Sequence, residues 1–340
     1  MSKSRLLTLV LLVGASRAQA VPILFNGWGA GQFGLVAVTP TVNLAGNVST
    51  SGGIFDAGIA VATGVNLALS SGTVTGAIDF ADPATKSTGG SCASDPGGVC
   101  KVDTASTFTG GTVTGVTLQY SAAVTNALNE WNNLIAAGAW GSTTGAMAVN
   151  LGSSGSPYVL CAGSGQTGCT STNNTTTTRV INGQTQTAYV FDISGTTGGT
   201  VNQNVTIKGD GSTLVVLIYN SAANALNVAK TFTLSGLTAD QVLLNVTSSK
   251  GITTASGFNF TGAMAVADTT ETLTGSVING RLFLNGSATA TLNGGFTLNA
   301  TADINSPEPS TEMLIGGALV LLAAAGRKIR FGRWLRRNRY

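Results

Sequence analysis

Short runs in which apolar and polar residues alternate recur along most of the chain, and glycine, asparagine and serine separate them. Such runs are typical of half-buried β-strands joined by turns. They cover residues 36–38, 42–44, 59–61, 65–69, 189–193, 232–234, 242–246, 263–267, 277–278, 282–284, 288–292 and 296–298. Residues 214–219 (LVVLIY) are apolar throughout, which predicts a strand buried on both faces. Residues 170–178 (TSTNNTTTT) lack apolar anchors and predict a polar loop.

The connections between these runs are too short for crossover helices. Closely spaced strands with tight links predict a mainly β fold in which parallel strands stack as coils, an irregular right-handed β-helix or solenoid. The pentapeptide GTVTG, at residues 72–76 and again at 111–115, is consistent with such repetition. A β-sandwich of short antiparallel hairpins has the same cadence of strands and turns and remains the alternative.

One segment, between residues 121 and 139, has helical periodicity. Its apolar residues Val124, Leu128, Trp131 and Ile135 follow one another at spacings of four, three and four. This spacing places them on one face of a helix, and Gly138 is the expected end of that helix. We therefore predict one α-helix that packs its apolar face against the β structure.

The first twenty residues have the pattern of a secretory signal peptide. Lys3 and Arg5 give a basic start, residues 6–15 are apolar, and Ala18 and Ala20 form a small-x-small cleavage site. An uncleaved membrane helix would need about 20 apolar residues, and this run is shorter. Cleavage is therefore expected after Ala20.

The C-terminal end combines three elements in a fixed order. The motif Pro307, Glu308, Pro309, Ser310 and Thr311 comes first, the apolar stretch 313–326 follows, and a basic tail ends the chain. The arginines of the tail are Arg327, Arg330, Arg333, Arg336, Arg337 and Arg339. A basic cluster beside a hydrophobic segment stays cytoplasmic, because moving arginine through lipid costs several kcal/mol. An ordinary C-terminal membrane anchor would share these features.

This arrangement resembles the PEP-CTERM sorting signal, and the match covers residues 307–340. In that family the membrane enzyme exosortase recognises the signal, removes the tail, and releases or transfers the protein to the envelope. The resemblance implies an exported precursor anchored in the inner membrane and then delivered to the cell envelope or extracellular matrix, with signal peptidase and exosortase as processing partners. The expected parts are a signal peptide (1–20), a β-rich body (21–306) and the sorting signal (307–340).

The body differs in charge from the whole chain. The chain carries 17 basic and 14 acidic residues, a formal net charge of +3. Three of the basic residues lie in the first twenty positions, and seven basic and two acidic residues lie after residue 306, which leaves 7 basic and 12 acidic residues in the body. A mildly acidic body argues against nucleic acid as a partner.

Four cysteines form two close pairs, Cys92 with Cys100 and Cys161 with Cys169, each in a glycine-rich loop. Four cysteines allow three pairings, and we favour the two local disulfides, which persist in an oxidising compartment. A metal site is the competing interpretation. It is disfavoured because the spacing does not fit zinc knuckles and the chain has no histidine.

The body also resembles the choice-of-anchor A domain of bacterial surface proteins. Residues 242–246 (VLLNV) match the family's vLfNv strand, and residues 275–280 (GSVING) match its late G-x-v-x-NG turn. Members of this family use different C-terminal anchors, PEP-CTERM among them. Ice-binding bacterial proteins with an irregular β-solenoid and a helix alongside have a similar layout, which supports the fold and does not transfer the activity.

Groups suited to catalysis are scarce in the body. Without histidine the commonest general base is absent, and nothing indicates the two facing carboxylates that a glycosidase needs. Asp79 and Asp82 flank a turn, where turn chemistry is their ordinary role. The segment 208–212 (KGDGS) has one acid, too few for a calcium loop, and predicts a turn. We therefore expect no enzymatic activity, no cofactor and no bound metal.

Threonine and asparagine in the strands suggest one kind of binding surface. On a solenoid face they would form a regular grid of hydroxyls and amides that can bind polysaccharide, a neighbouring surface or ordered water. The alternative is a soluble β surface made without charge. The sequence thus predicts a non-enzymatic surface or biofilm-matrix protein that acts in adhesion or in association with exopolysaccharide or cell-surface glycans. Ice binding is the second hypothesis, and a secreted polysaccharide hydrolase is the third.

Overall fold

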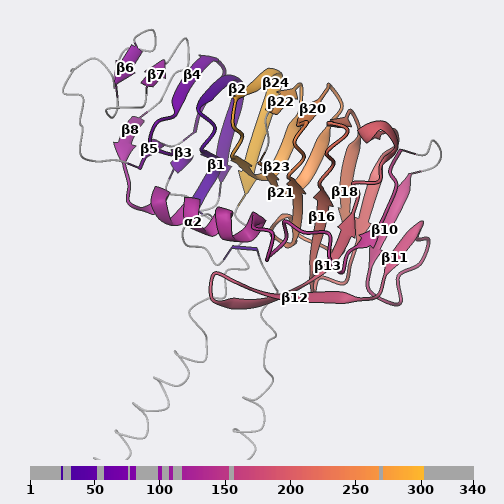
Figure 1. The fold of residues 1–340 in the computed structure, drawn as a ribbon. Helices are drawn as coiled ribbons and strands as arrows, with labels where there is room; N and C mark the ends of the chain where they lie inside the picture. Colours follow the sequence, from indigo (N-terminus) through magenta and orange to yellow (C-terminus); the bar gives the residue numbers. More distant parts are fainter. Residues whose placement is uncertain are drawn as a thin grey trace, which may run out of the picture. The chain divides into compact units, whose positions relative to one another are not determined.

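The computed structural model describes residues 24–25, 32–51, 57–75, 77–81, 99–101, 107–109, 117–152, 157–267 and 271–301. All of them belong to one compact unit, Val21–Ile304. They form a mainly β structure with one α-helix, α2 (Ala123–Ile135), and nearly all paired strands run parallel (Figure 1). The signal peptide, the 307–311 motif, the arginine tail and Cys92 lie outside the described residues, so the expectations for them stay predictions.

The strand pairings divide the parallel structure into three faces. Face A contains, in order along the stack, β8 (Thr117–Tyr120), β5 (Ala77–Phe80), β3 (Ala57–Val61), β1 (Phe33–Ala37), the second parts of β23 (Val277–Leu284) and β21 (Asn259–Val266), β19 (Val242–Val246), β16 (Leu214–Tyr219), β13 (Gln184–Asp192) and β9 (Met147–Ala148). Face B contains β7 (Thr107–Thr109), β4 (Asn66–Ser71), the first parts of β2 (Thr41–Ser51) and β24 (Thr289–Thr301), β22 (Glu271–Thr274), β20 (Ile252–Thr254), β17 (Leu226–Val228) and β14 (Thr200–Val201).

Face C contains the second parts of β2 and β24, the first parts of β23 and β21, then β18 (Thr231–Ser235), β15 (Val205–Lys208), β10 (Tyr158–Ala162) and β11 (Ser171–Asn173). Two strands pair antiparallel at the margins: β6 (Val99–Lys101) on β7, and β12 (Thr176–Ile181) on β13. Two short 3-10 helices complete the described elements, η2 (Thr197–Gly199) and η3 (Ala239–Gln241).

Successive strands along the chain lie on Faces A, B and C in turn. β16, β17 and β18 lie on Faces A, B and C, and β19, β20 and β21 stack on them in parallel register. Parallel coils of this kind are the arrangement of a β-solenoid. The parallel pairings contradict the alternative of an antiparallel β-sandwich.

The chain enters and leaves this stack in its middle. β1 pairs with β3 on one side and with β23 on the other, and β2 likewise lies between β4 and β24. The N-terminal coils therefore stack on the last coil of the chain. After β8, α2 runs across Face A, and the strands resume with β9 and β10 at the opposite end of the stack (Figure 1).

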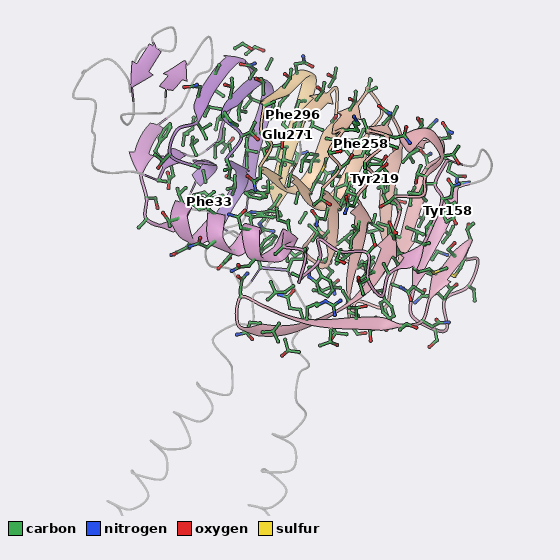
Figure 2. The ribbon with its side chains drawn as sticks, viewed as in Figure 1. Phe33, Tyr158, Tyr219, Phe258, Glu271 and Phe296 are labelled. Atoms are coloured by element: carbon green, nitrogen blue, oxygen red, sulfur yellow. A yellow bond between two sulfur atoms is a disulfide. The ribbon has the colours of Figure 1, made fainter. Side chains whose placement is uncertain are left out.

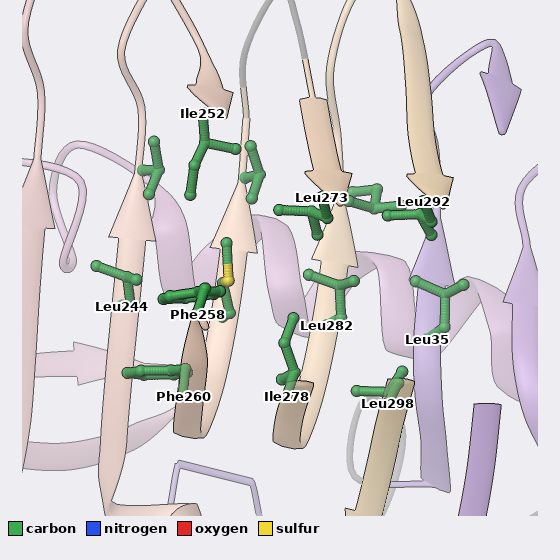
Figure 3. Packing of buried hydrophobic residues seen from close by; sticks show 14 of the residues in the cluster. Leu35, Leu244, Ile252, Phe258, Phe260, Leu273, Ile278, Leu282, Leu292 and Leu298 are labelled. Atoms are coloured by element: carbon green, nitrogen blue, oxygen red, sulfur yellow. The ribbon is translucent and has the colours of Figure 1, made fainter. Parts of the chain in front are cut away.

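Two apolar layers hold the stack together. The first fills the interior between the three faces, where side chains from successive strands, such as Leu244, Leu282 and Leu35, belong to one continuous cluster (Figure 3). The second lies between the outer side of Face A and α2, where Trp131 stacks on Phe283 with ring centroids 5.1 Å apart. Both sides of β16 are buried because they face different layers, as the apolar run in its sequence predicted.

The predicted apolar face of α2 is confirmed: Val124, Trp131 and Ile135 are buried, and Leu128 is half-buried. The helix nevertheless ends before Gly138, because Ala136 takes an extended conformation and the chain turns inward. Trp140 is buried there, and its carbonyl oxygen accepts a hydrogen bond from Nδ2 of Asn245 at 2.9 Å. The helix thus ends at Ile135, before the glycine that the sequence suggested, and the buried Trp140 follows shortly after it.

Glycines mark corners within long strands, where the sequence predicted separate strands. Residues 277–278 and 282–284 belong to one strand, β23, which turns from Face C to Face A at Gly280. Most of the predicted run 288–292, from Thr289 onward, and residues 296–298 belong to β24, which turns from Face B to Face C near Gly294 and Gly295. We call the corner where Face C becomes Face A the C–A edge; it contains Gly34, Asp240, Gly262, Gly280 and Ala300.

The polar loop predicted for residues 170–178 is wrong. β11 and the beginning of β12 occupy this segment. The hydroxyl oxygens of Thr178 and Thr187 lie 3.1 Å apart across the β12–β13 ladder, and Asn173 Nδ2 donates to the carbonyl of Val190 at 2.9 Å. Hydrogen bonds from polar side chains therefore support strands that lack apolar anchors.

A candidate binding face

Face A offers no open surface in the middle of the stack, because α2 covers it. Its outward side chains, such as Leu243 and Phe283, are buried in the layer beneath the helix. Phe25 adds to this cover, with its ring 4.8 Å from that of Trp131. A partner would have to displace the helix to reach this face.

Face C is more open, but its polar side chains bond to one another. Asn299 Nδ2 donates to Asn279 Oδ1, and Asn279 Nδ2 donates to Asn259 Oδ1, each at 3.0 Å. Ser49 Oγ donates to Asn299 Oδ1, also at 3.0 Å. Lys208 places a positive charge on the same face. Asn279 and Asn299 therefore each donate one hydrogen bond and accept one within the protein.

Face B carries a row of uncharged side chains in register, here called the ladder row. It consists of Thr200 (β14), Asn227 (β17), Thr253 (β20), Thr272 (β22), Thr291 (β24) and Asn43 (β2). Neighbouring strands are about 4.8 Å apart, so the six side chains extend over roughly 24 Å along the stack. Among the side chains that the structure describes, the other outward positions of Face B are also Thr, Asn, Ser or Ala.

The ladder row keeps much of its hydrogen-bonding capacity for solvent or a partner. Within the described part of the chain, the hydroxyls of Thr253, Thr272 and Thr291 have no hydrogen-bond partner, in contrast to the amides of Face C. Each hydroxyl can donate one hydrogen bond and accept others. Thr253 and Asn43 are exposed, and the others are half-buried between their neighbours.

The one acidic residue in the described strands of Face B, Glu271, does not reach the outer surface. Its side chain is buried, with 1% of its surface exposed. Figure 2 labels the position of Glu271 in the body. Oε2 of Glu271 accepts a hydrogen bond from Thr39 Oγ1 at 2.7 Å, and Thr39 Oγ1 in turn accepts one from the backbone N–H of Gly286 at 2.8 Å. The carboxylate is thus a structural group, and the outward side chains that the structure describes on the Face B strands are uncharged.

No family model and no curated protein sequence matches the chain. Two similar solved structures are both of an ice-binding protein (LeIBP) from an Arctic yeast. The glycosylated form has 16% identity and a TM-score of 0.40, with 84% of this chain and 96% of that chain covered. The second, solved to explain antifreeze activity, has 14% identity and a TM-score of 0.38 at the same coverage. A likeness this distant carries no argument about what this chain binds.

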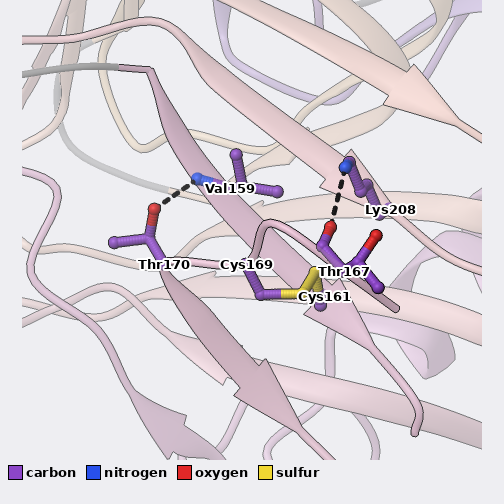
Figure 4. The surroundings of a disulfide bond; sticks show 6 residues. All are labelled: Val159, Cys161, Thr167, Cys169, Thr170 and Lys208. Carbon is purple, nitrogen blue, oxygen red and sulfur yellow. Dashed lines mark hydrogen bonds between the residues drawn. A yellow bond between two sulfur atoms is a disulfide. The ribbon is translucent and has the colours of Figure 1, made fainter. Parts of the chain in front are cut away.

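The disulfide predicted between Cys161 and Cys169 is present (Figure 4). It closes the loop between β10 and β11, at the end of the stack where β10 begins the returning coils. The same loop is held by a hydrogen bond from the Val159 backbone N–H to Thr170 Oγ1 at 3.0 Å, and by Lys208 Nζ donating to the carbonyl of Thr167 at 3.0 Å. The bridge between Cys92 and Cys100 stays a prediction.

Removing this bridge should destabilise the body. For a sequence separation of 8, loop-closure entropy gives about 2.5 kcal/mol. We expect the double variant Cys161→Ser/Cys169→Ser to lose about that much free energy of unfolding in urea under oxidising conditions. Wild-type protein measured without reductant is the reference. A loss below about 0.5 kcal/mol would mean that the two hydrogen bonds alone hold the loop.

The carboxylates considered from the sequence have structural surroundings. The turn role predicted for Asp79 is wrong, since Asp79 lies buried within β5, whereas Asp82 lies outside the described residues. The turn predicted at residues 208–212 is confirmed: Ser212 donates from Oγ and from its backbone N–H to Asp210 Oδ1, at 2.6 and 2.8 Å. These bonds, the hydroxyl first, hold the pKa of Asp210 below its ordinary value.

No group of three or more acidic or cysteine side chains is placed to hold a metal ion within the described residues. None of the helices they form has the length and apolar character to cross a membrane.

The two segments that resemble the choice-of-anchor A domain have structural positions. Residues 242–246 form β19, and Asn245 within it is the residue whose amide fixes the carbonyl of Trp140. Residues 275–280 lead into β23 and end at Gly280 on the C–A edge. The first motif therefore contacts the segment that follows α2, and the second contains the glycine at the C–A edge. Neither motif contributes a side chain to the ladder row.

Proposed function

We propose that this chain is an exported, exosortase-sorted surface protein that acts without catalysis, by binding exopolysaccharide of the producing cell through Face B. The observation that carries the binding part is the ladder row: six uncharged hydroxyl and amide side chains in register on a face that none of the described helices covers. A linear polysaccharide also presents hydroxyls at regular intervals. Many weak contacts along such a row can give a high overall affinity, because one polymer chain connects them and each contact raises the effective concentration for the next.

The neutrality of Face B leads to a specific expectation. Binding that rests on hydroxyl and amide hydrogen bonds should not depend on ionic strength, whereas interactions between exposed charges are screened by salt. We expect the full chain to be retained on the producer's own purified exopolysaccharide to the same extent in low and in high salt. A neutral polymer of different linkage serves as the control. Absence of retention, or retention that disappears in salt, would contradict the proposal.

Ice is the second candidate partner, and the threonines favour it. Four of the six members of the ladder row are threonines, each with a methyl and a hydroxyl at a fixed spacing. An ice surface is a regular lattice of hydrogen-bonded oxygens, and such a row could match it without a pocket. Thermal hysteresis and ice shaping by the purified chain decide this candidate. Neither effect at high protein concentration would remove it.

The sorting part of the proposal is supported by the two ends of the sequence. Mass spectrometry of the protein from its native host is the direct test. We expect an N-terminus at Val21 and loss of the segment that follows the 307–311 motif. Recovery of the chain from the cytosol with Met1 and Tyr340 both present would contradict export and sorting.

We also propose that the coils wind right-handed, as an irregular right-handed β-helix. Connections between parallel strands of one sheet are right-handed in about 98% of cases, because of the twist of the strands. An experimental structure of the body would settle the hand, and left-handed coils would overturn this assignment.

A further inference from the structure

Both ends of the described body lie at the same corner of the coil. β24 ends at Thr301, which pairs with Ser51 at the far end of Face C. Just before that end, Ala300 lies beside Gly34 of β1: a Cβ built on Gly34 would be 3.0 Å from the Cβ of Ala300. The C-terminal end of the body therefore leaves from the C–A edge.

The N-terminal end is fastened to the same edge. The backbone N–H of Leu24 donates to the carbonyl of Asp240 at 2.8 Å, and Asp240 lies in η3, the turn that leads from Face C to Face A. The guanidinium carbon of Arg281 lies 5.3 Å from the centre of the Phe25 ring, and Arg281 forms a buried ion pair with Asp240. Leu24 and Phe25 are thus part of the packed body, and the N-terminal end of the described residues lies at this edge.

The C–A edge has a fixed relation to the candidate binding face. A coil with three faces has three corners, and the corner between Faces C and A is opposite Face B. Both ends are also near the middle of the stack, because β1 and β24 belong to the central coils. A connection through either end therefore holds the body on the side away from the ladder row and near its midpoint.

We infer that attachment through the chain ends presents Face B outward over its whole length. The inference rests on the proposed function for the role of Face B, and it adds the direction in which the ladder row points. A body attached by the end of its stack, or along Face B, would hide part of the row. Attachment at the C–A edge leaves all six members accessible to an extended partner.

Thiol labelling on liposomes tests this inference. The chain from Val21 to Tyr340, with a hexahistidine tag directly before Val21, is bound to neutral nickel-chelating liposomes. Residues 21–23 span at most about 10 Å, so the tether is short. Single variants Thr253→Cys on Face B and Ser51→Cys beside the C–A edge are labelled with a bulky, impermeant maleimide, on liposomes and in detergent. The parent chain gives the background.

We expect Thr253→Cys to react at the same rate on liposomes as in detergent, and Ser51→Cys to react several-fold more slowly on liposomes. Slowing of Thr253→Cys as great as that of Ser51→Cys, or no slowing of Ser51→Cys, would overturn the inference. A flotation assay without nickel separates this from the proposed sorting. If the chain floats only with nickel, the anchoring role of the tail fails, and the labelling pattern still decides which face points outward.

Discussion

Replacing Asp240 with alanine is expected to lower the free energy of unfolding by about 3–5 kcal/mol. The carboxylate of Asp240 pairs with Arg281, whose side chain is 2% exposed. Without Asp240, the guanidinium would remain buried beside the Phe25 ring and η3 and would lack the carboxylate that balances its charge. Urea unfolding followed by tryptophan fluorescence measures the loss, because Trp131 lies in the same layer.

The exposed turn residue Asp210 provides the control for this prediction. Asp210→Ala removes a carboxylate that also accepts hydrogen bonds, but on the surface, and should cost no more than about 1 kcal/mol. The double variant Asp240→Ala/Arg281→Leu should recover much of the stability, because a buried ion pair replaced by apolar side chains is often neutral. A single-variant loss below about 1 kcal/mol would mean that Arg281 reaches water or another anion.

The second large effect is expected at the C–A edge, where Gly280→Ala should cost about 3 kcal/mol. A Cβ on Gly280 would lie 2.0 Å from the carbonyl oxygen of Gly262 in the neighbouring strand, and both atoms belong to paired backbones. The backbone φ of Gly280 is also positive, at 154°. Accommodating the methyl group would therefore require β21 and β23 to separate at the corner.

Gly195→Ala is the matched control for this substitution. A Cβ on Gly195 meets nothing within 4 Å, and Gly195 does not have a positive φ. Its replacement should change the free energy of unfolding by no more than about 0.5 kcal/mol. Equal stability of the two variants would show that the corner is not closely packed, and would contradict the described pairing of Gly262 with Gly280.

The sequence predicted the strands better than their connections. Alternation and apolar runs located β16 and β19 at their observed bounds, because both have a simple pattern of burial. Glycine was taken as the end of a strand, yet Gly280 allows a strand to continue around a corner. The local sequence around a glycine cannot show whether a strand bends there or ends there. The outcome depends on whether the strand of the next coil continues the backbone hydrogen bonds past the glycine.

The order of the coils could not be predicted from the sequence at all. β1 pairs with β23, more than two hundred residues away, because α2 carries the chain to the other end of the stack. No local signal encodes that return. The same pairings place both chain ends on the C–A edge, so the inferred direction of Face B also required the structure.

The sequence predicted a surface of threonine and asparagine side chains, but it did not predict which face of the solenoid carries it. Threonine and asparagine occur on Faces B and C alike, and the sequence gives no means of separating them. The distinction lies in the hydrogen bonds: Asn279 and Asn299 are engaged with each other, whereas Thr253 and Thr272 are not engaged within the described residues. Side-chain pairing across strands, which needs the register, decides which face can offer its polar groups to a partner.

A matched pair of lysine substitutions tests Face B as the binding face most directly. Thr253 and Thr233 are both exposed threonines in the middle of short strands, the first on Face B and the second on Face C. In an equilibrium assay with exopolysaccharide, we expect Thr253→Lys to weaken binding about tenfold or more, which corresponds to about 1.4 kcal/mol, and Thr233→Lys to leave it unchanged. Equal losses in the two variants, or a loss confined to Thr233→Lys, would contradict the assignment of Face B.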